Sequence, residues 1–336
     1  MTGADADAPP ADTPPADTSP AGRADPGADG ALEAIWPQSL LRHERVELDD
    51  GRSLGFGEWG ADDGDPLLWF HGTPGAGLQV PPNAPREAAA RGYRLIVVER
   101  PGTGWSTPHR YGRVRDFADD VGQLADLLEL DRFAVAGLSG GGPFVLAVAH
   151  EMPDRVVTGA VLGGIGPTTG PEQAPGYTRI LPLWEPLLRR IRDPFGGVVT
   201  SMVQRASPWA VPGFGIYKRV APQSDRAVFD DPEMEAMFIH DVVIAAARGF
   251  GAPLHDLALF ARPWGFSLRD VSVPITFWHG DADSIVPLSH SEHQAALVQD
   301  GTVVVKPGAG HFAGFTVIEE VLDTVDLRWH DRGSRP

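Results

Sequence analysis

The chain has 336 residues, of which 42% are hydrophobic, so it is long and apolar enough for one large folded unit or two and is not disordered throughout. Its 28 Lys and Arg are outnumbered by 45 Asp and Glu, and the net charge of −17 argues against nucleic acid or an anionic membrane surface as the main partner. The lack of cysteine excludes disulfides, thiolate nucleophiles and cysteine-based metal sites, and it is consistent with a reducing compartment.

The N-terminal segment differs in composition from the rest. Residues 1–34 consist mainly of Ala, Pro, Asp and Gly, and such a segment buries too little surface to offset the entropy of ordering it. We predict that it forms a disordered acidic tail. The tail lacks the basic and apolar regions of a secretory signal, and no apolar run reaches the roughly 18 residues of a membrane-spanning helix. These features predict a cytoplasmic protein without a membrane partner.

From residue 46 onward, strand and helix patterns alternate. Val46–Leu48 and Ser53–Glu58 flank the turn residues Asp49, Asp50 and Gly51 and predict a hairpin. The elements predicted after it are, in chain order, the strand Leu67–Phe70, the helix Asn83–Arg91, the strand Leu95–Val98, the helix Asp116–Leu130, the strand Phe133–Gly137, the helix Gly140–His150, the strands Val156–Leu162, Ile275–Trp278 and Thr302–Val305, and the helix Phe312–Asp326. This alternation predicts an α/β fold with a mainly parallel sheet covered by helices on both faces. Sites in such sheets form where the strands end.

A long insertion interrupts the alternation. Residues 167–270 separate two predicted strands, and this segment is too long to be a structureless loop in a compact domain. Asp231 followed by Pro232 is typical of a helix N-terminus, and the helical pattern continues to Ala247. We therefore predict a helical cap at 167–270, inserted into an α/β core formed by residues 35–166 and 271–330.

A serine stands between one predicted strand and the helix that follows it. Gly137, Ser139 and Gly141 have the spacing of the motif G-x-S-x-G, in the strand–turn–helix context that the motif requires. The sharp turn predicts a positive φ at Ser139 and close contact between the two glycines. The hydroxyl then stands at a helix N-terminus, whose free N–H groups can stabilise an oxyanion. Ser139 is thus the candidate nucleophile; the alternative is a serine that only caps the helix.

Two further polar residues follow strand ends. Asp283 comes shortly after the strand Ile275–Trp278, and His311 lies in the turn after the last strand. A serine hydroxyl is a weak nucleophile until an imidazole accepts its proton, and a carboxylate fixes the tautomer of that imidazole. The order Ser139, Asp283, His311 therefore predicts a catalytic triad, with Asp281 as the less favoured acid.

The segment after the strand Leu67–Phe70 is a candidate for the oxyanion hole. It reads His71-Gly-Thr-Pro-Gly75, in which Gly72 permits a sharp turn and Pro74 restricts the backbone. We expect the backbone N–H of Thr73 to lie with that of Gly140 beside Ser139. The alternative interpretation is an ordinary Gly-Pro turn.

Together these segments resemble the α/β-hydrolase fold superfamily, specifically the cap-bearing serine hydrolases close to proline iminopeptidases and related esterases. The resemblance covers roughly residues 44–328 and rests on the blocks His71–Gly75, Glu99–Ser106, Gly137–Gly141, Gly280–Pro287 and Gly310–His311. It implies an eight-stranded sheet in which only the second strand is antiparallel. It also implies catalytic roles for Ser139, Asp283 and His311, and an oxyanion hole formed by the N–H groups of Thr73 and Gly140.

The sequence departs from the family pattern at two positions. Glu99 stands where the family often has Asp, and Thr73 stands where iminopeptidases usually have Gly. Iminopeptidases also need acidic cap residues that bind a free amine, and the acids available here are Glu172, Glu185, Glu233 and Glu235. The serine at 139 excludes the branches of the superfamily that use an aspartate nucleophile.

Other motifs carry weaker signals. Gly55–Gly60 matches a dinucleotide-binding pattern in letters, but a turn follows it rather than a helix. His290, Glu292 and His293 lack a further spaced ligand, so we predict neither a cofactor nor a metal. The cap pairs His240-Asp241 and His255-Asp256 are expected at the surface or as helix caps.

The function predicted from the sequence is hydrolysis of a carboxylic ester, or a related acyl bond, of a small molecule through an acyl-enzyme. Two alternatives on the same fold remain. One is an aminopeptidase or a carbon–carbon-bond hydrolase, and the other is a non-catalytic ligand sensor.

Overall fold

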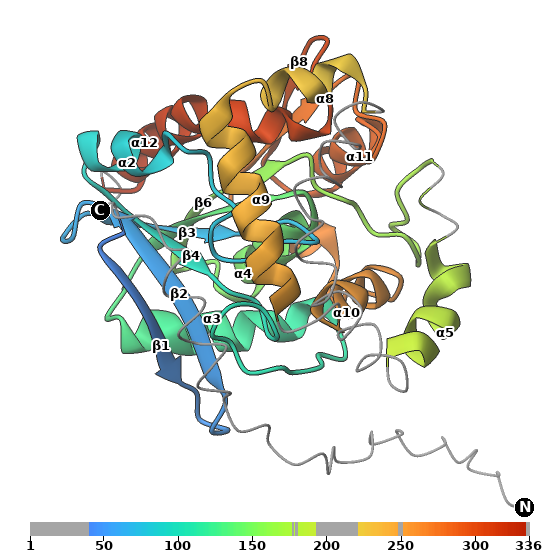
Figure 1. Cartoon of the computed structure of the whole chain (residues 1–336), viewed down its shortest axis with the longest axis horizontal. Helices are drawn as coiled ribbons and strands as arrows, with labels where there is room; N and C mark the ends of the chain where they lie inside the picture. Colours follow the sequence, from blue (N-terminus) through green and yellow to red (C-terminus); the bar gives the residue numbers. More distant parts are fainter. Residues whose placement is uncertain (1–39, 177, 179–180, 193–220, 248–250, 334–336) are drawn as a thin grey trace, which may run out of the picture.

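The computed structural model describes residues 40–176, 178, 181–192, 221–247 and 251–333 (Figure 1). The tail predicted at 1–34 lies outside these residues. The strands form one 8-stranded sheet in the order β1-β2-β4-β3-β5-β6-β7-β8. Their bounds are β1 Arg42–Glu47, β2 Ser53–Gly60, β3 Asp65–Phe70, β4 Tyr93–Val98, β5 Phe133–Leu138, β6 Val156–Leu162, β7 Ile275–Gly280 and β8 Gly301–Lys306. Only β2 runs against the other strands, as the resemblance implied.

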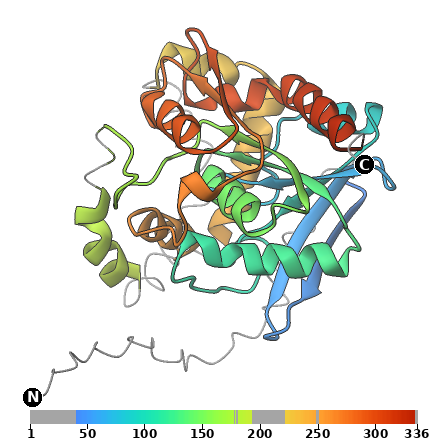
Figure 2. The same ribbon diagram turned by 180° about the vertical axis from the view of Figure 1, so that it is seen from behind.

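Helices cover both faces of the sheet, as the alternation of elements predicted (Figure 1 and Figure 2). One face packs against α2 (Ala84–Ala90) and α12 (Ile318–Gly333). The other packs against α3 (Phe117–Leu127), α4 (Gly142–Glu151) and α11 (Ser289–Leu297). Short 3₁₀ segments are η1 (Val114–Asp116), η2 (Ser139–Gly141), η5 (Leu268–Asp270) and η6 (His311–Thr316).

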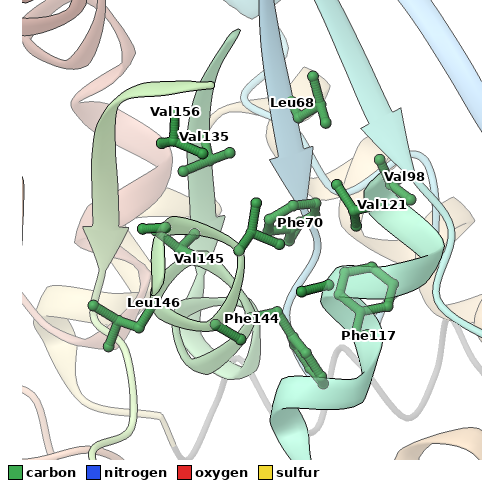
Figure 3. Packing of buried hydrophobic residues seen from close by; sticks show 14 of the residues in the cluster. Leu68, Phe70, Val98, Phe117, Val121, Val135, Phe144, Val145, Leu146 and Val156 are labelled. Carbon is green, nitrogen blue, oxygen red and sulfur yellow. The ribbon is translucent and has the colours of Figure 1, made fainter. Parts of the chain in front are cut away.

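The core follows from the period of two along each strand. In β3, Leu68 and Phe70 belong to the cluster beneath α3 and α4, whereas the alternate residues Leu67 and Trp69 belong to the opposite cluster. Figure 3 shows Phe70, Phe117 and Phe144 packed in this cluster. The ring centroids of Phe70 and Phe117 are 5.4 Å apart, and those of Phe117 and Phe144 are 5.0 Å apart. This packing fixes β3 and β5 against α4, and the segments that follow these two strands carry two parts of the site described below.

Three elements differ from the sequence-based expectations. The helix expected at Asp116–Leu130 ends earlier, at Leu127, and Glu129 has a left-handed φ of 56°. The helix expected at Phe312–Asp326 is divided into η6 and α12. The helix α11 was not expected, because buried polar residues such as His290 and Gln294 interrupt its apolar pattern.

Between β6 and β7, the described residues form α5 (Leu181–Arg192), α8 (Gln223–Val228), α9 (Pro232–Ala247) and α10 (Gly251–Phe260). The start of α9 at Pro232 confirms the helix expected there. In Figure 1, α9 runs across the front of the central strands. Phe260 of α10 and Trp264 are buried in the cluster that contains α3 and α4, so α10 packs directly on the sheet layers. The exact division into core and cap stays a prediction.

Candidate active site

Ser139 occupies a sharp turn between β5 and α4. Its φ is 50°, a left-handed value that few non-glycine residues adopt, as the motif predicted. A Cβ on Gly137 would lie 2.7 Å from the carbonyl carbon of Gly141, and one on Gly141 would overlap the carbonyl oxygen of Phe70. Both flanking positions therefore require glycine, and the turn presents the serine side chain beyond the end of β5.

The structure brings Ser139, His311 and Asp283 together. His311 Nε2 lies 2.9 Å from Ser139 Oγ, and His311 Nδ1 lies 2.7 Å from Asp283 Oδ2. The three residues follow β5, β8 and β7, whose parallel directions bring their carboxyl ends to one edge of the sheet. Asp281, the less favoured acid, instead accepts the N–H of Gly308 at 2.6 Å.

The Asp283 carboxylate is almost fully buried, with 1% of its side chain exposed. Its Oδ1 accepts the N–H groups of Ile285 and Val286, each at 2.8 Å, and its Oδ2 also lies 3.2 Å from Nε2 of the buried His279. Burial raises the pKa of Asp283, but hydrogen bonds from His279 and His311 outweigh it and hold this pKa well below its usual range. The carboxylate is therefore ionised and fixes the orientation of His311.

Thr73 lies beside the first turn after Ser139. A Cβ on Gly140 would lie 3.1 Å from Thr73 N, so the two backbone segments are in direct contact. The Thr73 N–H donates to no residue in the described part of the chain. Gly140 belongs to the first turn of a helical segment, where N–H groups lack intrahelical partners. The peptide bond between Thr73 and Pro74 is cis.

Arg100, which follows β4, binds the loop that carries Thr73, and the sequence analysis gave it no role. The residue is 2% exposed, and its Nη2 donates to Gly72 O at 2.8 Å and to Thr73 Oγ1 at 2.9 Å. Asp256 of α10 accepts from Arg100 Nη2 at 2.8 Å and from the Thr73 hydroxyl at 2.7 Å. Burial, with the nearby Arg100 charge, holds the pKa of His71 well below its usual range, so this side chain is neutral.

Two further aspartates from the insertion bind loops of the site. Asp241 of α9 is fully buried and accepts the N–H groups of Ala76 and Leu78, each at 3.1 Å. Asp225 of α8 is also fully buried and accepts the N–H of Phe312 at 3.2 Å. The expectation that Asp241 and Asp256 lie at the surface or cap helices was wrong, because both are buried against the loop that follows β3.

A cavity of about 360 Å³ opens at Ser139 and His311. Its other lining residues are mainly apolar, with Leu138 from the end of β5, Ile285 from the loop after β7, and Phe238 and Val242 from α9. A second cavity, of about 370 Å³, lies on the opposite side of α9, at Glu233, Met237 and His240. Opposite faces of this one helix therefore border two separate cavities.

None of the acids considered for amine binding is among the described residues that line the cavity at Ser139. Glu172 accepts the N–H of Leu268 at 2.8 Å, and Glu185 Oε1 accepts from Arg262 Nε at 2.8 Å. Glu233 borders the second cavity, and Glu235 is on the same helix.

The weaker motifs have structural explanations. His290 Nδ1 accepts the N–H of Gly166 at 2.8 Å, and His293 Nε2 donates to Glu172 O at 2.9 Å, so both join α11 to the segment after β6. Within the described ranges, no three His, Asp or Glu side chains are grouped as metal ligands would be. A Cβ on Gly55 would overlap Oε2 of the buried Glu99, which accounts for one glycine of the letter pattern at 55–60. No helix in the described part of the chain has the length and apolar character needed to cross a membrane.

Comparisons with known proteins agree with this architecture. The profile of the family described as "alpha/beta hydrolase fold" matches residues 65–197. A proline iminopeptidase from Arabidopsis thaliana is 32% identical over 123 residues, which span 36% of this chain and 32% of that protein. A non-heme haloperoxidase from Rhodococcus erythropolis is 27% identical over 270 residues, which span 79% of this chain and 92% of that protein.

Solved structures share the fold at low sequence identity. A hydrolase from Pseudomonas aeruginosa has a TM-score of 0.64 and 18% identity, covering 86% of this chain and 98% of its own. A thermophilic esterase from Thermogutta terrifontis has a TM-score of 0.59 and 22% identity, and the match covers 87% of this chain and 99% of the esterase. The chain has the α/β-hydrolase fold, as its motifs predicted, and the family match at residues 65–197 supports its assignment to the superfamily of that name. Within that superfamily it is similar to proline iminopeptidases over about a third of the Arabidopsis protein's length, and to a haloperoxidase over most of that protein's length.

Proposed function

We propose that the protein is a serine hydrolase that cleaves a carboxylic ester of a small molecule. The observation that carries this proposal is the chain of hydrogen bonds from Ser139 Oγ to His311 Nε2, 2.9 Å, and from His311 Nδ1 to Asp283 Oδ2, 2.7 Å. This arrangement lets an imidazole accept the proton of a hydroxyl while a carboxylate stabilises the imidazolium that forms.

In the proposed reaction, Ser139 Oγ attacks the ester carbonyl as His311 Nε2 takes its proton. The oxyanion accepts hydrogen bonds from the N–H groups of Thr73 and Gly140. His311 then gives the proton to the departing alcohol, and an acyl-enzyme remains on Ser139. A water molecule, deprotonated by His311, attacks this acyl group, and collapse of the second tetrahedral intermediate releases the carboxylic acid and restores the serine.

The lining of the cavity supports an uncharged, apolar acyl group as the substrate portion bound there. Leu138, Phe238, Val242, Ile285 and Phe312 surround the reacting atoms. Gln79 also lines the cavity with a polar side chain. This side chain already accepts from Gly72 N and donates to Pro74 O, so its hydrogen-bonding groups are used within the protein. Apolar contact area of this kind favours acyl chains over charged groups.

Replacement of Ser139 by Ala tests the proposal. We expect turnover of a p-nitrophenyl ester to fall on the order of 10⁶-fold, as in other triads, and labelling by a fluorophosphonate to disappear. Ser289→Ala, at the start of α11, is the matched control and should keep both. Unchanged esterase activity in Ser139→Ala would contradict the assignment.

An aminopeptidase is the second candidate, because the sequence is similar to proline iminopeptidases. The cavity supports it less well, since no carboxylate that could bind a free amine is among the described lining residues, apart from the proposed catalytic machinery. The ratio of kcat/KM values for proline β-naphthylamide and p-nitrophenyl butyrate separates the two. We expect the ester to be strongly preferred, and preference for the amide would favour the peptidase.

A further inference from the structure

We infer that Asp256 and Arg100 are positioning residues that direct the Thr73 N–H toward the oxyanion. Because Asp256 belongs to α10, this helix of the insertion then contributes to how strongly the oxyanion is stabilised. This inference rests on the proposed function, because it concerns how the same site stabilises its oxyanion. Neither side chain is among the residues that line the cavity at Ser139, so neither is expected to touch the substrate.

A single planar peptide group joins the Gly72 carbonyl to the Thr73 N–H. The carbonyl of Gly72 and the N–H of Thr73 belong to the same trans peptide, so they point in opposite directions. The Gly72 carbonyl accepts hydrogen bonds from Arg100 Nη2 and from His71 Nδ1, each at 2.8 Å, and these two contacts fix the rotation of the peptide plane. The Thr73 N–H is thereby directed away from Arg100. A cation on the carbonyl also polarises the peptide, which makes its N–H a stronger donor.

The Thr73 side chain is held by both Asp256 and Arg100. Its hydroxyl donates to Asp256 Oδ2 at 2.7 Å and accepts from Arg100 Nη2 at 2.9 Å, so both hydrogen-bonding directions are used. Arg100 also donates through Nε to the same Asp256 oxygen at 3.1 Å. Thr73, which supplies the N–H, is thus fixed at two points, through the carbonyl of Gly72 and through its own hydroxyl.

The negative charge of Asp256 is compensated by Arg100. A lone carboxylate this close to an oxyanion hole would oppose the developing negative charge. The Asp256 carboxylate is paired with the buried Arg100, and the guanidinium also lies 4.9 Å from the ring centre of Phe144 in α4, the helix behind Ser139. Asp256 can therefore hold Thr73 without leaving an uncompensated negative charge beside the reacting atoms.

The test compares Asp256→Ala, Asp256→Asn and Thr73→Val in the full chain. An oxyanion donor contributes about 10²–10³ to kcat, so a misaimed donor should cost about 10- to 100-fold in kcat with KM within about threefold. Asp256→Asn, which keeps an acceptor oxygen, should lose less than Asp256→Ala. In the double variant Thr73→Val/Asp256→Ala, the losses should not add, because both changes break the same hydrogen bond.

Inhibition by an arylboronic acid gives a readout that a purely structural role would not move. Boronate forms a tetrahedral adduct with serine, so its Ki should rise by the same factor as kcat/KM falls. The matched control is Asp120→Ala, which removes another buried aspartate paired with an arginine, at Arg52 Nη2, 2.7 Å. It should lower Tm and leave kcat and the boronate Ki unchanged.

Several outcomes would overturn the inference. Asp256→Ala with kcat and boronate Ki within about twofold of the parent protein would do so, and so would a rise in KM at constant kcat, which indicates substrate contact. If Asp256→Ala fails to fold, Asp256→Asn and Thr73→Val decide by the same criteria. Ser139→Ala, run in the same assays, tests the proposed function separately, since only its retained turnover would remove the serine mechanism itself.

Discussion

At the scale of single residues, burial changes the ionisation of Asp241. This carboxyl is fully buried in α9 against backbone N–H groups of the loop after β3, and burial raises its pKa from 3.8 to about 7. The folded protein therefore holds a proton that the unfolded chain releases. A group of this kind stabilises the fold fully below pH 4, and its contribution is lost as the pH rises toward 7.

We expect Asp241→Asn to remove this pH dependence. Between pH 4 and pH 7 the parent protein loses on the order of 4 kcal/mol of its free energy of unfolding, the value for a fully buried group with this pKa shift. The Tm of the parent protein should therefore decrease relative to that of Asp241→Asn as the pH rises from 4.5 to 8. Thermal unfolding followed by circular dichroism measures the difference, with the exposed Asp119→Asn as control. A difference that stays constant across this range would show that Asp241 ionises normally in the folded state.

At the scale of elements, α9 separates the cavity at Ser139 from the second cavity. Phe238 and Val242 face the first, whereas Glu233, Met237 and His240 face the second. The 3.6-residue period of the helix puts these two sets on opposite sides. The residues on the first side are in position to limit the length of the acyl group of the proposed ester substrate.

We expect Val242→Phe to shorten the acyl chain that the site accepts. The larger side chain fills part of the 360 Å³ cavity, so kcat/KM for a p-nitrophenyl octanoate should fall at least about tenfold relative to the acetate. Met237→Phe makes a similar change on the other side of α9 and should leave this ratio unchanged. An equal loss in both variants would indicate a general disturbance of the helix rather than a specific effect on the cavity.

The sequence predicted most elements of the core because each has a local signal. Strands such as β6, predicted at Val156–Leu162 and observed with the same bounds, are unbroken apolar runs. The glycine spacing around Ser139 predicted its positive φ for the same reason, since the constraint acts over five residues. By contrast, Thr73 and Asp256 are 183 residues apart and Ala76 and Asp241 are 165 apart. No local sequence pattern marks such pairs. The contacts of these aspartates could therefore be recognised only from the position of the insertion on the core.

At the scale of the whole molecule, three helices of the insertion each place one aspartate on a loop of the site. Asp225 of α8 binds the loop at Phe312, Asp241 of α9 binds the loop at Ala76, and Asp256 of α10 binds Thr73 and Arg100. A cover that only filters substrates would not need such contacts. The insertion is therefore part of the framework that holds the loops carrying Thr73 and His311.

We expect a chain in which residues 181–247 are replaced by a linker of roughly ten residues to lose activity even on p-nitrophenyl acetate. Asp225 and Asp241 are removed, while α10, which packs on the core, remains. Turnover should fall at least about 100-fold, because the loops that carry the N–H donor and His311 lose their anchors. Near-UV circular dichroism checks that the core is folded. Retained acetate hydrolysis in a folded protein would mean that the insertion acts only on specificity.

These aspartate contacts also limit how the protein can be recombined with its relatives. A chimera that takes the insertion from one parent and residues 71–79 and 310–312 from another would separate each carboxylate from the amide or hydroxyl that it binds. Crossover points that keep those loops and the insertion in one inherited block should yield working hybrids, and crossovers between them should not. In this fold the long segment between β6 and β7 and the short loops beneath it would then be exchanged as a single unit.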